Sequence, residues 1–233
     1  MKNNDKKLVL FDIDGTLIHP GNGAKRALTK AIFKNFGIKI KVTYENTAGK
    51  TDRWIIKDIL LESGIRQNLI DEKMGKIIDD YLTFIKEEYN KDNDAKVFES
   101  VFELLEKLSK IENVYLGLLT GNIEHGARIK LSPFNLNRFF PFGAFGSDGM
   151  YRDDLPGIAL KRAKHLYGVS FYGKNLVIIG DTVNDVTCGK KFNAKSIAVV
   201  RRPEYLEKVK KAKPDFLFTG FEEIDKVIGA ILL

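Results

Sequence analysis

The 233-residue sequence is poor in cysteine and histidine and contains no long apolar run. Its one cysteine, Cys188, excludes an internal disulfide and any metal site built from several cysteines. The three histidines lie in unrelated contexts, which argues against a zinc centre. We expect Cys188 to be a buried, inert thiol and the histidines to be ordinary surface or core residues, namely His19, His125 and His165.

No stretch approaches the length of a membrane span, and the charged segment 1–7 precedes an apolar run too short for a signal peptide. We therefore expect a cytoplasmic protein that binds no membrane. The apolar fraction of 44% is that of an ordinary globular protein. The length allows one or two domains with a full core.

The net charge of +7 raises the question of polyanion binding, because lysines cluster near the C-terminus. Leu206 and Val209 recur within this cluster at helical spacing, which is typical of an amphipathic helix with a solvated face. We therefore expect no nucleic acid binding. The positive charge would instead raise the local concentration of small anionic substrates. The clustered lysines are Lys208, Lys210, Lys211 and Lys213.

Short apolar runs bounded by turn residues recur along the chain, as expected for strands buried on both faces. Helical patterns lie between most of them, for example over 97–111 and 155–166. This alternation predicts an α/β fold with a Rossmann-like parallel sheet flanked by helices. The predicted strands cover residues 8–11, 114–119, 142–145, 176–179, 197–200 and 216–218.

The segment 18–92 departs from this alternation, because it contains no convincing strand. Helix-like stretches cover about 24–36, 51–61 and 69–89. A helical insertion after the first strand would form a small cap domain, a lid above the carboxyl end of that strand. We expect a catalytic core of residues 1–17 and 93–233 and a cap of residues 18–92.

Two acids, Asp12 and Asp14, follow the first apolar run and precede a glycine. In open α/β sheets, ligands bind at the carboxyl ends of the strands. An ordinary turn is an alternative, since Asp and Gly favour turns for local reasons. A calcium loop of the EF-hand type is excluded, because it needs Glu at its twelfth position and the sequence has Gly23 there.

Further polar residues follow two later runs: Thr120 after the second, and Asp181 with Asp185 after the run 176–179. Parallel strands would bring these residues to one edge with Asp12 and Asp14. Two unit charges about 4 Å apart repel by about 4 kcal/mol at an effective dielectric near 20, so the cluster needs protons or a cation. Oxygen ligands without His or Cys favour Mg²⁺ as the cofactor.

The motifs Asp12-Ile13-Asp14-Gly15-Thr16, Thr120, and Gly180-Asp181 with Asp185 resemble the haloacid dehalogenase superfamily, in order and over nearly the whole chain. The helical insertion is similar to the cap of its phosphoglycolate phosphatase-like and β-phosphoglucomutase-like branch.

The resemblance implies that Asp12 attacks phosphorus to give an aspartyl-phosphate. Asp14 would protonate the leaving oxygen and later take a proton from water. Members that displace halide lack the second acid, so Asp14 favours phosphoryl transfer.

By the same match, Mg²⁺ would be held by the Asp12 side chain, the Asp14 backbone carbonyl and Asp181, with Asp185 nearby. Phosphoryl oxygens would bind Thr120 and the Gly121 amide. The implied substrate-binding residues also include Thr16 and Asn122.

The superfamily's third motif, a lysine often followed by proline, is not matched. Asp153-Asp154-Leu155-Pro156 occupies the region, and no lysine precedes the proline. Arg152 is our candidate for the missing cation and Lys161 the alternative. The competing interpretations are a surface arginine paired with Asp153 or Asp154, and a lysine on an exposed helix face.

The segment Ala48-Gly49-Lys50-Thr51-Asp52 lies where that branch carries a cap loop facing the active site. Lys50 and Thr51 would bind an anionic substrate tail, or Thr51 is a helix N-cap after a glycine turn, and the sequence leaves both open. A phosphonate-cleaving relative would use a cap lysine as Schiff base, which keeps that role open for Lys50.

Together these features predict a Mg²⁺-dependent phosphatase for a small phosphorylated metabolite, phosphoglycolate first and sugar phosphates next. The alternatives are a phosphomutase, a phosphonatase, or a non-catalytic binding protein that keeps the fold. We expect a monomer or homodimer.

Overall fold

A six-stranded parallel sheet forms the centre of the computed structural model, which describes residues 6–233. The strand order is β5-β4-β1-β6-β7-β8. Residues 1–5 lie outside the described residues. The expectation about the charged N-terminal segment 1–7 rests largely on them. The strands are β1 Lys7–Phe11, β4 Val114–Leu119, β5 Gly143–Ala144, β6 Leu176–Gly180, β7 Lys195–Val199 and β8 Phe216–Phe218.

Both faces of the sheet are buried, which explains the continuous apolar runs. Val9 and Phe11 of β1 pack toward one face, with α5, α6 and α10, and Leu8 and Leu10 toward the other, with α7 and α8. The core helices are α5 Val101–Ser109, α6 Glu124–Leu131, α7 Leu155–Tyr167, α8 Val183–Cys188, α9 Pro203–Lys211 and α10 Ile224–Leu232. The layered α/β class expected from the sequence is therefore confirmed.

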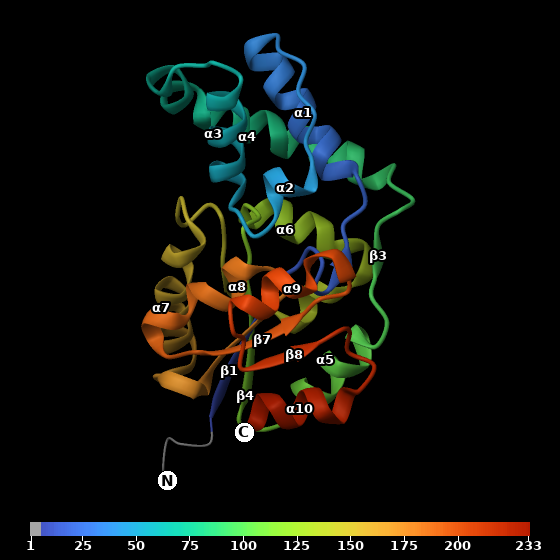
Figure 1. The fold of residues 1–233 in the computed structure, drawn as a ribbon, viewed down its shortest axis with the longest axis vertical. Coiled ribbons are helices and arrows are strands. Elements are labelled where there is room, and N and C mark those ends of the chain that lie inside the picture. Colours follow the sequence, from blue (N-terminus) through green and yellow to red (C-terminus); the bar gives the residue numbers. More distant parts are fainter. Residues whose placement is uncertain (1–5) are drawn as a thin grey trace.

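The four helices within residues 23–90 form a separate lobe above the carboxyl end of the sheet (Figure 1). The two long ones, α1 and α4, pack against each other through residues such as Ala31 and Ile77. The helices are α1 Gly23–Phe36, α2 Tyr44–Thr47, α3 Asp52–Glu62 and α4 Gln67–Asn90.

A short antiparallel ribbon of β2 (Ile18–His19) and β3 (Lys96–Val97) joins the cap to the core. Ile18 pairs with Val97, and His19 with Lys96. The prediction that the segment 18–92 contains no strand was wrong for its first two residues, which form β2. The helix predicted over 97–111 begins later than expected, at Val101. Val97 belongs to the ribbon, and Ser100 at φ 61° separates it from α5.

Two smaller expectations hold. Leu206 and Val209 lie on one amphipathic helix, α9, with Val209 buried. Cys188 is also buried, and burial raises the pKa of its thiol to about 12. Within residues 6–233, none of the helices combines the length and apolar character that a membrane crossing demands.

Candidate active site

The loop after β1 carries the two acids of the first motif. The Asp12 backbone N–H donates to Ile179 O of the neighbouring β6, which fixes the start of the loop. Gly15 adopts φ +85°, and a Cβ there would lie 2.2 Å from Asp181 Oδ2. Glycine is therefore required for two reasons, the left-handed backbone and the close approach of Asp181.

Arg152 lies beside the Asp12 carboxylate, on a short 3-10 helix that precedes α7. Its side chain is 2% exposed, and its Nη2 atom donates to Asp12 Oδ1 at 3.0 Å, to Asp185 Oδ1 at 2.5 Å and to Leu119 O at 2.6 Å. One nitrogen thus holds two carboxylates and the carboxyl end of β4. The surface-arginine interpretation was wrong.

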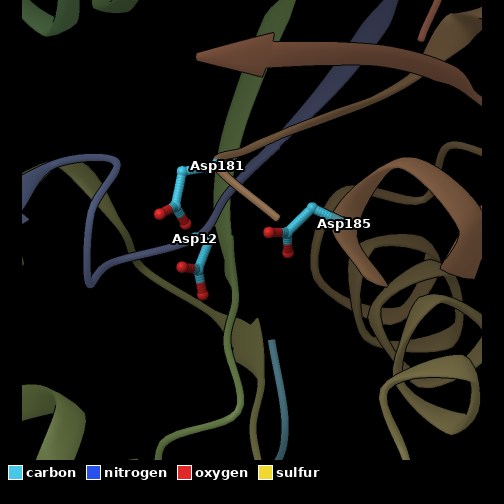
Figure 2. A group of neighbouring side chains, drawn as sticks. All are labelled: Asp12, Asp181 and Asp185. Atoms are coloured by element: carbon cyan, nitrogen blue, oxygen red, sulfur yellow. The ribbon is translucent and has the colours of Figure 1, made fainter. Parts of the chain in front are cut away.

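Three carboxylates point toward one another at the ends of β1 and β6 (Figure 2). Asp12, Asp181 and Asp185 each offer an oxygen within 4.8 Å of the others. Burial raises the pKa of Asp12 to about 7, with Arg152 opposing the rise and Asp185 adding to it. Burial, and then Asp185 and Asp12, hold the pKa of Asp181 well above its ordinary value. This cluster is stable only with protons or a cation.

The residues present fit a hard cation. Asp181 Oδ1 is buried without a hydrogen-bond partner among the described residues, so it is a free oxygen ligand. Asp185 differs, because Arg152 holds its Oδ1, while Thr182 N and Oγ1 donate to its Oδ2 at 3.0 and 2.6 Å. Asp185 and Thr182 form the capping box of α8. Asp12 and Asp181 are therefore the available side-chain ligands, with Asp185 behind them.

Asp14 lies in a different network from Asp12. Its Oδ2 accepts from Lys130 Nζ at 2.5 Å and from Asn122 Nδ2 at 3.0 Å. The same Asn122 amide donates to Thr120 Oγ1 at 2.9 Å. The two acids of one motif thus have different partners.

A cavity of about 570 Å³ lies between the core and the cap. The sequence-predicted site residues that line it are Asp12, Asp14, Lys50, Thr120, Gly121, Asn122, Arg152 and Asp181. Residues of the cap and of the core, which lie far apart in the sequence, therefore meet at one site.

Four predicted residues do not line the cavity. Asp185 is buried in the first turn of α8, behind Asp12 and Asp181. Thr16 is fully buried. Thr51 is also fully buried and caps α3, accepting from Trp54 N at 3.2 Å and donating to Met150 O at 2.5 Å, as the N-cap interpretation expected. Lys161 is exposed on α7, so it is not the cation beside Asp12.

Lys50 lines the cavity from the cap loop, and its ammonium donates to Asp58 at 2.8 Å. It also lies over the Trp54 ring, 5.4 Å from the centroid. A Schiff-base lysine needs a free, neutral amine. The ion pair with Asp58 does not favour that role.

Sequence reasoning missed a contact between cap and core at the cavity mouth. The rings of Tyr44 and Tyr205 lie 4.5 Å apart, and the Arg202 guanidinium lies 4.3 Å from the Tyr44 centroid. Tyr44 OH also approaches Asp181 Oδ2 at 3.5 Å. Tyr44 belongs to the cap and the other two to the core, so no local pattern indicates their meeting.

Comparisons with known proteins agree with this geometry. Residues 9–199 match the family model described as haloacid dehalogenase-like hydrolase. A phosphoglycolate phosphatase from Colwellia psychrerythraea is 24% identical over 233 residues, covering 96% of this chain and 97% of the relative. The pyrophosphatase PpaX from Anoxybacillus flavithermus is 23% identical over 226 residues, covering 95% and 96%.

Among solved structures, a hydrolase from Pseudomonas syringae matches with a TM-score of 0.74 at 18% identity, covering 98% of this chain and 100% of that one. The fold, the order of the motifs and the match over most of the chain lead to one conclusion: this chain belongs to the haloacid dehalogenase-like hydrolase family.

Proposed function

We propose that this protein is a Mg²⁺-dependent phosphatase that hydrolyses a small phosphorylated metabolite through an aspartyl-phosphate on Asp12. The observation that carries the proposal is the unequal environment of the two acids. Asp12 lies in the buried carboxylate cluster against Arg152, whereas Asp14 is held by Lys130 and Asn122 through Oδ2 alone and keeps its other oxygen, Oδ1, buried without a partner among the described residues. The first arrangement suits a nucleophile and the second a group that exchanges protons.

In the proposed reaction, a carboxylate oxygen of Asp12 bonds to phosphorus while the bond from phosphorus to the ester oxygen breaks. Asp14 gives its proton to that oxygen. A water molecule then attacks phosphorus, Asp14 takes its proton, and the bond to Asp12 breaks to release inorganic phosphate. Thr120 and Gly121 would bind phosphoryl oxygens. Mg²⁺ held by Asp12, Asp181 and the Asp14 carbonyl would neutralise charge on the transferring group.

The cavity supports a substrate with a second anionic group. Arg201, Arg202 and Lys25 line it in addition to the cations beside the acids. The Lys25 ammonium makes no ion pair with any residue in the part of the chain that the structure describes. We infer that phosphoglycolate is the first substrate to test, followed by pyrophosphate and sugar phosphates.

The test is phosphate release from p-nitrophenyl phosphate and then from these candidates, with and without Mg²⁺. We expect Mg²⁺-dependent release of phosphate from p-nitrophenyl phosphate and from the candidate metabolites, with the highest kcat/KM on phosphoglycolate. Isomerisation of a sugar phosphate without phosphate release would identify a mutase. No release from any ester with Mg²⁺, Mn²⁺ or Co²⁺ would leave the non-catalytic binding protein. The cytoplasmic location and the monomeric or homodimeric state stay predictions.

Mg²⁺ is expected to raise the melting temperature more at pH 8 than at pH 5. Burial raises the pKa of Asp12 from its ordinary 3.8 to about 7 and holds that of Asp181 well above its ordinary value, so the metal-free native state binds protons that the unfolded chain has lost. Its free energy of unfolding therefore falls as the pH rises from about 4 through about 7. Mg²⁺ binds the ionised acids, so its stabilising effect grows with pH.

Thermal unfolding with and without Mg²⁺ at the two pH values measures this effect. Asp181→Asn should remove the Mg²⁺-dependent shift, whereas Asp225→Asn, at an exposed position on α10, should keep it. An equal shift at both pH values, or one that survives Asp181→Asn, would contradict the proposed ligand set.

A further inference from the structure

Lys130 is a buried lysine whose charge is used inside the active site. It lies in the last turn of α6 and is 3% exposed. Lysines are almost never this buried without a partner. Its Nζ donates to Asp14 Oδ2 at 2.5 Å and to Asn122 Oδ1 at 2.6 Å. Asp14 lies in the loop after β1 and Asn122 in the loop after β4, so α6 places a positive charge at the centre of the site.

The three side chains of Lys130, Asn122 and Asp14 fix one another. Because the Asn122 carbonyl accepts from Lys130, its amide nitrogen faces Asp14 and Thr120, to which it donates at 3.0 and 2.9 Å. Asp14 Oδ2 therefore receives two donors. Asp14 Oδ1 receives none from the described residues and is buried.

A second acid near Lys130 has its own partner. Asp52, at the start of α3 in the cap, accepts from Ile123 N at 2.8 Å. Burial raises the pKa of Asp52 to about 6, and Lys130 is the first of the influences that lower it. Among residues 6–233 the ammonium donates hydrogen bonds only to Asp14 and Asn122. The ion pair is thus made with the core acid rather than with the cap.

We propose that Lys130 is a positioning residue for Asp14: by holding Oδ2, it leaves Oδ1 as the atom that exchanges the proton. The inference rests on the proposed function. As the bond from phosphorus to the ester oxygen breaks, the proton on Oδ1 passes to that oxygen, and the electron pair of the O–H bond stays on Asp14. In the second step a proton from water returns to Oδ1 while the bond from Asp12 to phosphorus breaks. Lys130 gives up no proton in either step.

The test uses two substrates that differ in their need for a proton. An alkyl ester such as phosphoglycolate leaves as an alkoxide that must be protonated, whereas 2,4-dinitrophenyl phosphate releases a phenolate that leaves without one. The ratio kcat/KM reports the steps up to departure of the leaving group. Lys130→Met should lower kcat/KM for the alkyl ester by on the order of 10²-fold and that for the aryl ester by no more than about threefold.

Matched variants separate positioning from a general structural effect. Lys195→Met removes another buried lysine, at the amino end of β7, whose Nζ donates to Ala230 O at 2.9 Å. It should leave kcat/KM unchanged for both esters. Lys130→Arg should restore part of the alkyl-ester activity. In an Asp14→Asn background, Lys130→Met should cause little further loss. Lys130→Gln, which keeps a donor, replaces the methionine variant where that variant does not fold.

Equal losses on the two esters, or no loss on either, would overturn the proposal. Crystal structures of the wild type and Lys130→Met supply a readout that needs no turnover. The proposal expects Asp14 Oδ2 to leave Asn122 in the variant, and an unmoved Asp14 would overturn it. A wild type inactive on every ester refutes the proposed function, while the crystallographic comparison still decides whether Lys130 positions Asp14.

Discussion

Asp12→Asn is expected to lower kcat for p-nitrophenyl phosphate by on the order of 10⁴-fold or more, the scale seen when a nucleophile is removed. An amide cannot form the aspartyl-phosphate, yet its carbonyl oxygen still accepts from Arg152 Nη2, which lies 3.0 Å from Asp12 Oδ1. The fold should therefore survive. Removing one of the clustered carboxylates should even raise the melting temperature of the metal-free protein, because burial and repulsion raise the pKa of Asp12 to about 7.

Initial rates of phosphate release and thermal unfolding measure the two effects. Asp225→Asn makes the same chemical change at an exposed site and should alter neither. If Asp12→Asn kept more than about a hundredth of the wild-type kcat, the assignment of the nucleophile would fail.

Arg152→Ala is the second large effect, and it should differ sharply from Arg152→Lys. Loss of the guanidinium removes the donor that orients Asp12, so we expect kcat to fall by about 10²- to 10³-fold, as for loss of an oxyanion donor. It also leaves Asp12 and Asp185 buried without their cation, which should lower the free energy of unfolding by about 3–5 kcal/mol.

Arg152→Lys should keep kcat within about tenfold of the wild type, because one nitrogen makes all three contacts and an ammonium carries three donors. Arg162 serves as the control. It lies on α7, the helix that follows Arg152, and pairs with Asp148 at 2.5 Å but does not line the cavity, so Arg162→Ala should change stability without changing kcat. Equal kcat losses in the alanine and lysine variants of Arg152 would show that the guanidinium fork is required.

The sequence identifies the acids of the site because strand ends carry their own signal. An apolar run broken by Asp predicts both a buried strand and the edge where it stops, and parallel pairing then places Asp12 beside Asp181. Arg152 is only a candidate at that stage, because a sequence shows nothing of the fold that turns its side chain toward the ends of β1 and β4.

Lys130 has no such signal. A lysine in the last turn of a helix ordinarily lies in solvent and favours the helix dipole. Its burial results from the packing of α6 beneath the cap, which is a tertiary effect. The ribbon of β2 and β3 escapes detection for a related reason, since two-residue strands are too short to show a period.

The central position of β1 in the sheet affects how the protein folds while it is being synthesised. Lys7 pairs with Val114 and Leu8 with Leu176, so β1 leaves the ribosome well before the two strands with which it pairs. At roughly 5–20 residues per second, both edges of β1 stay open for on the order of ten seconds. The nascent chain thus carries an apolar, unpaired strand while the residues up to β6 are made, and the segment bearing Asp12 is enclosed only after its partner strands have been translated.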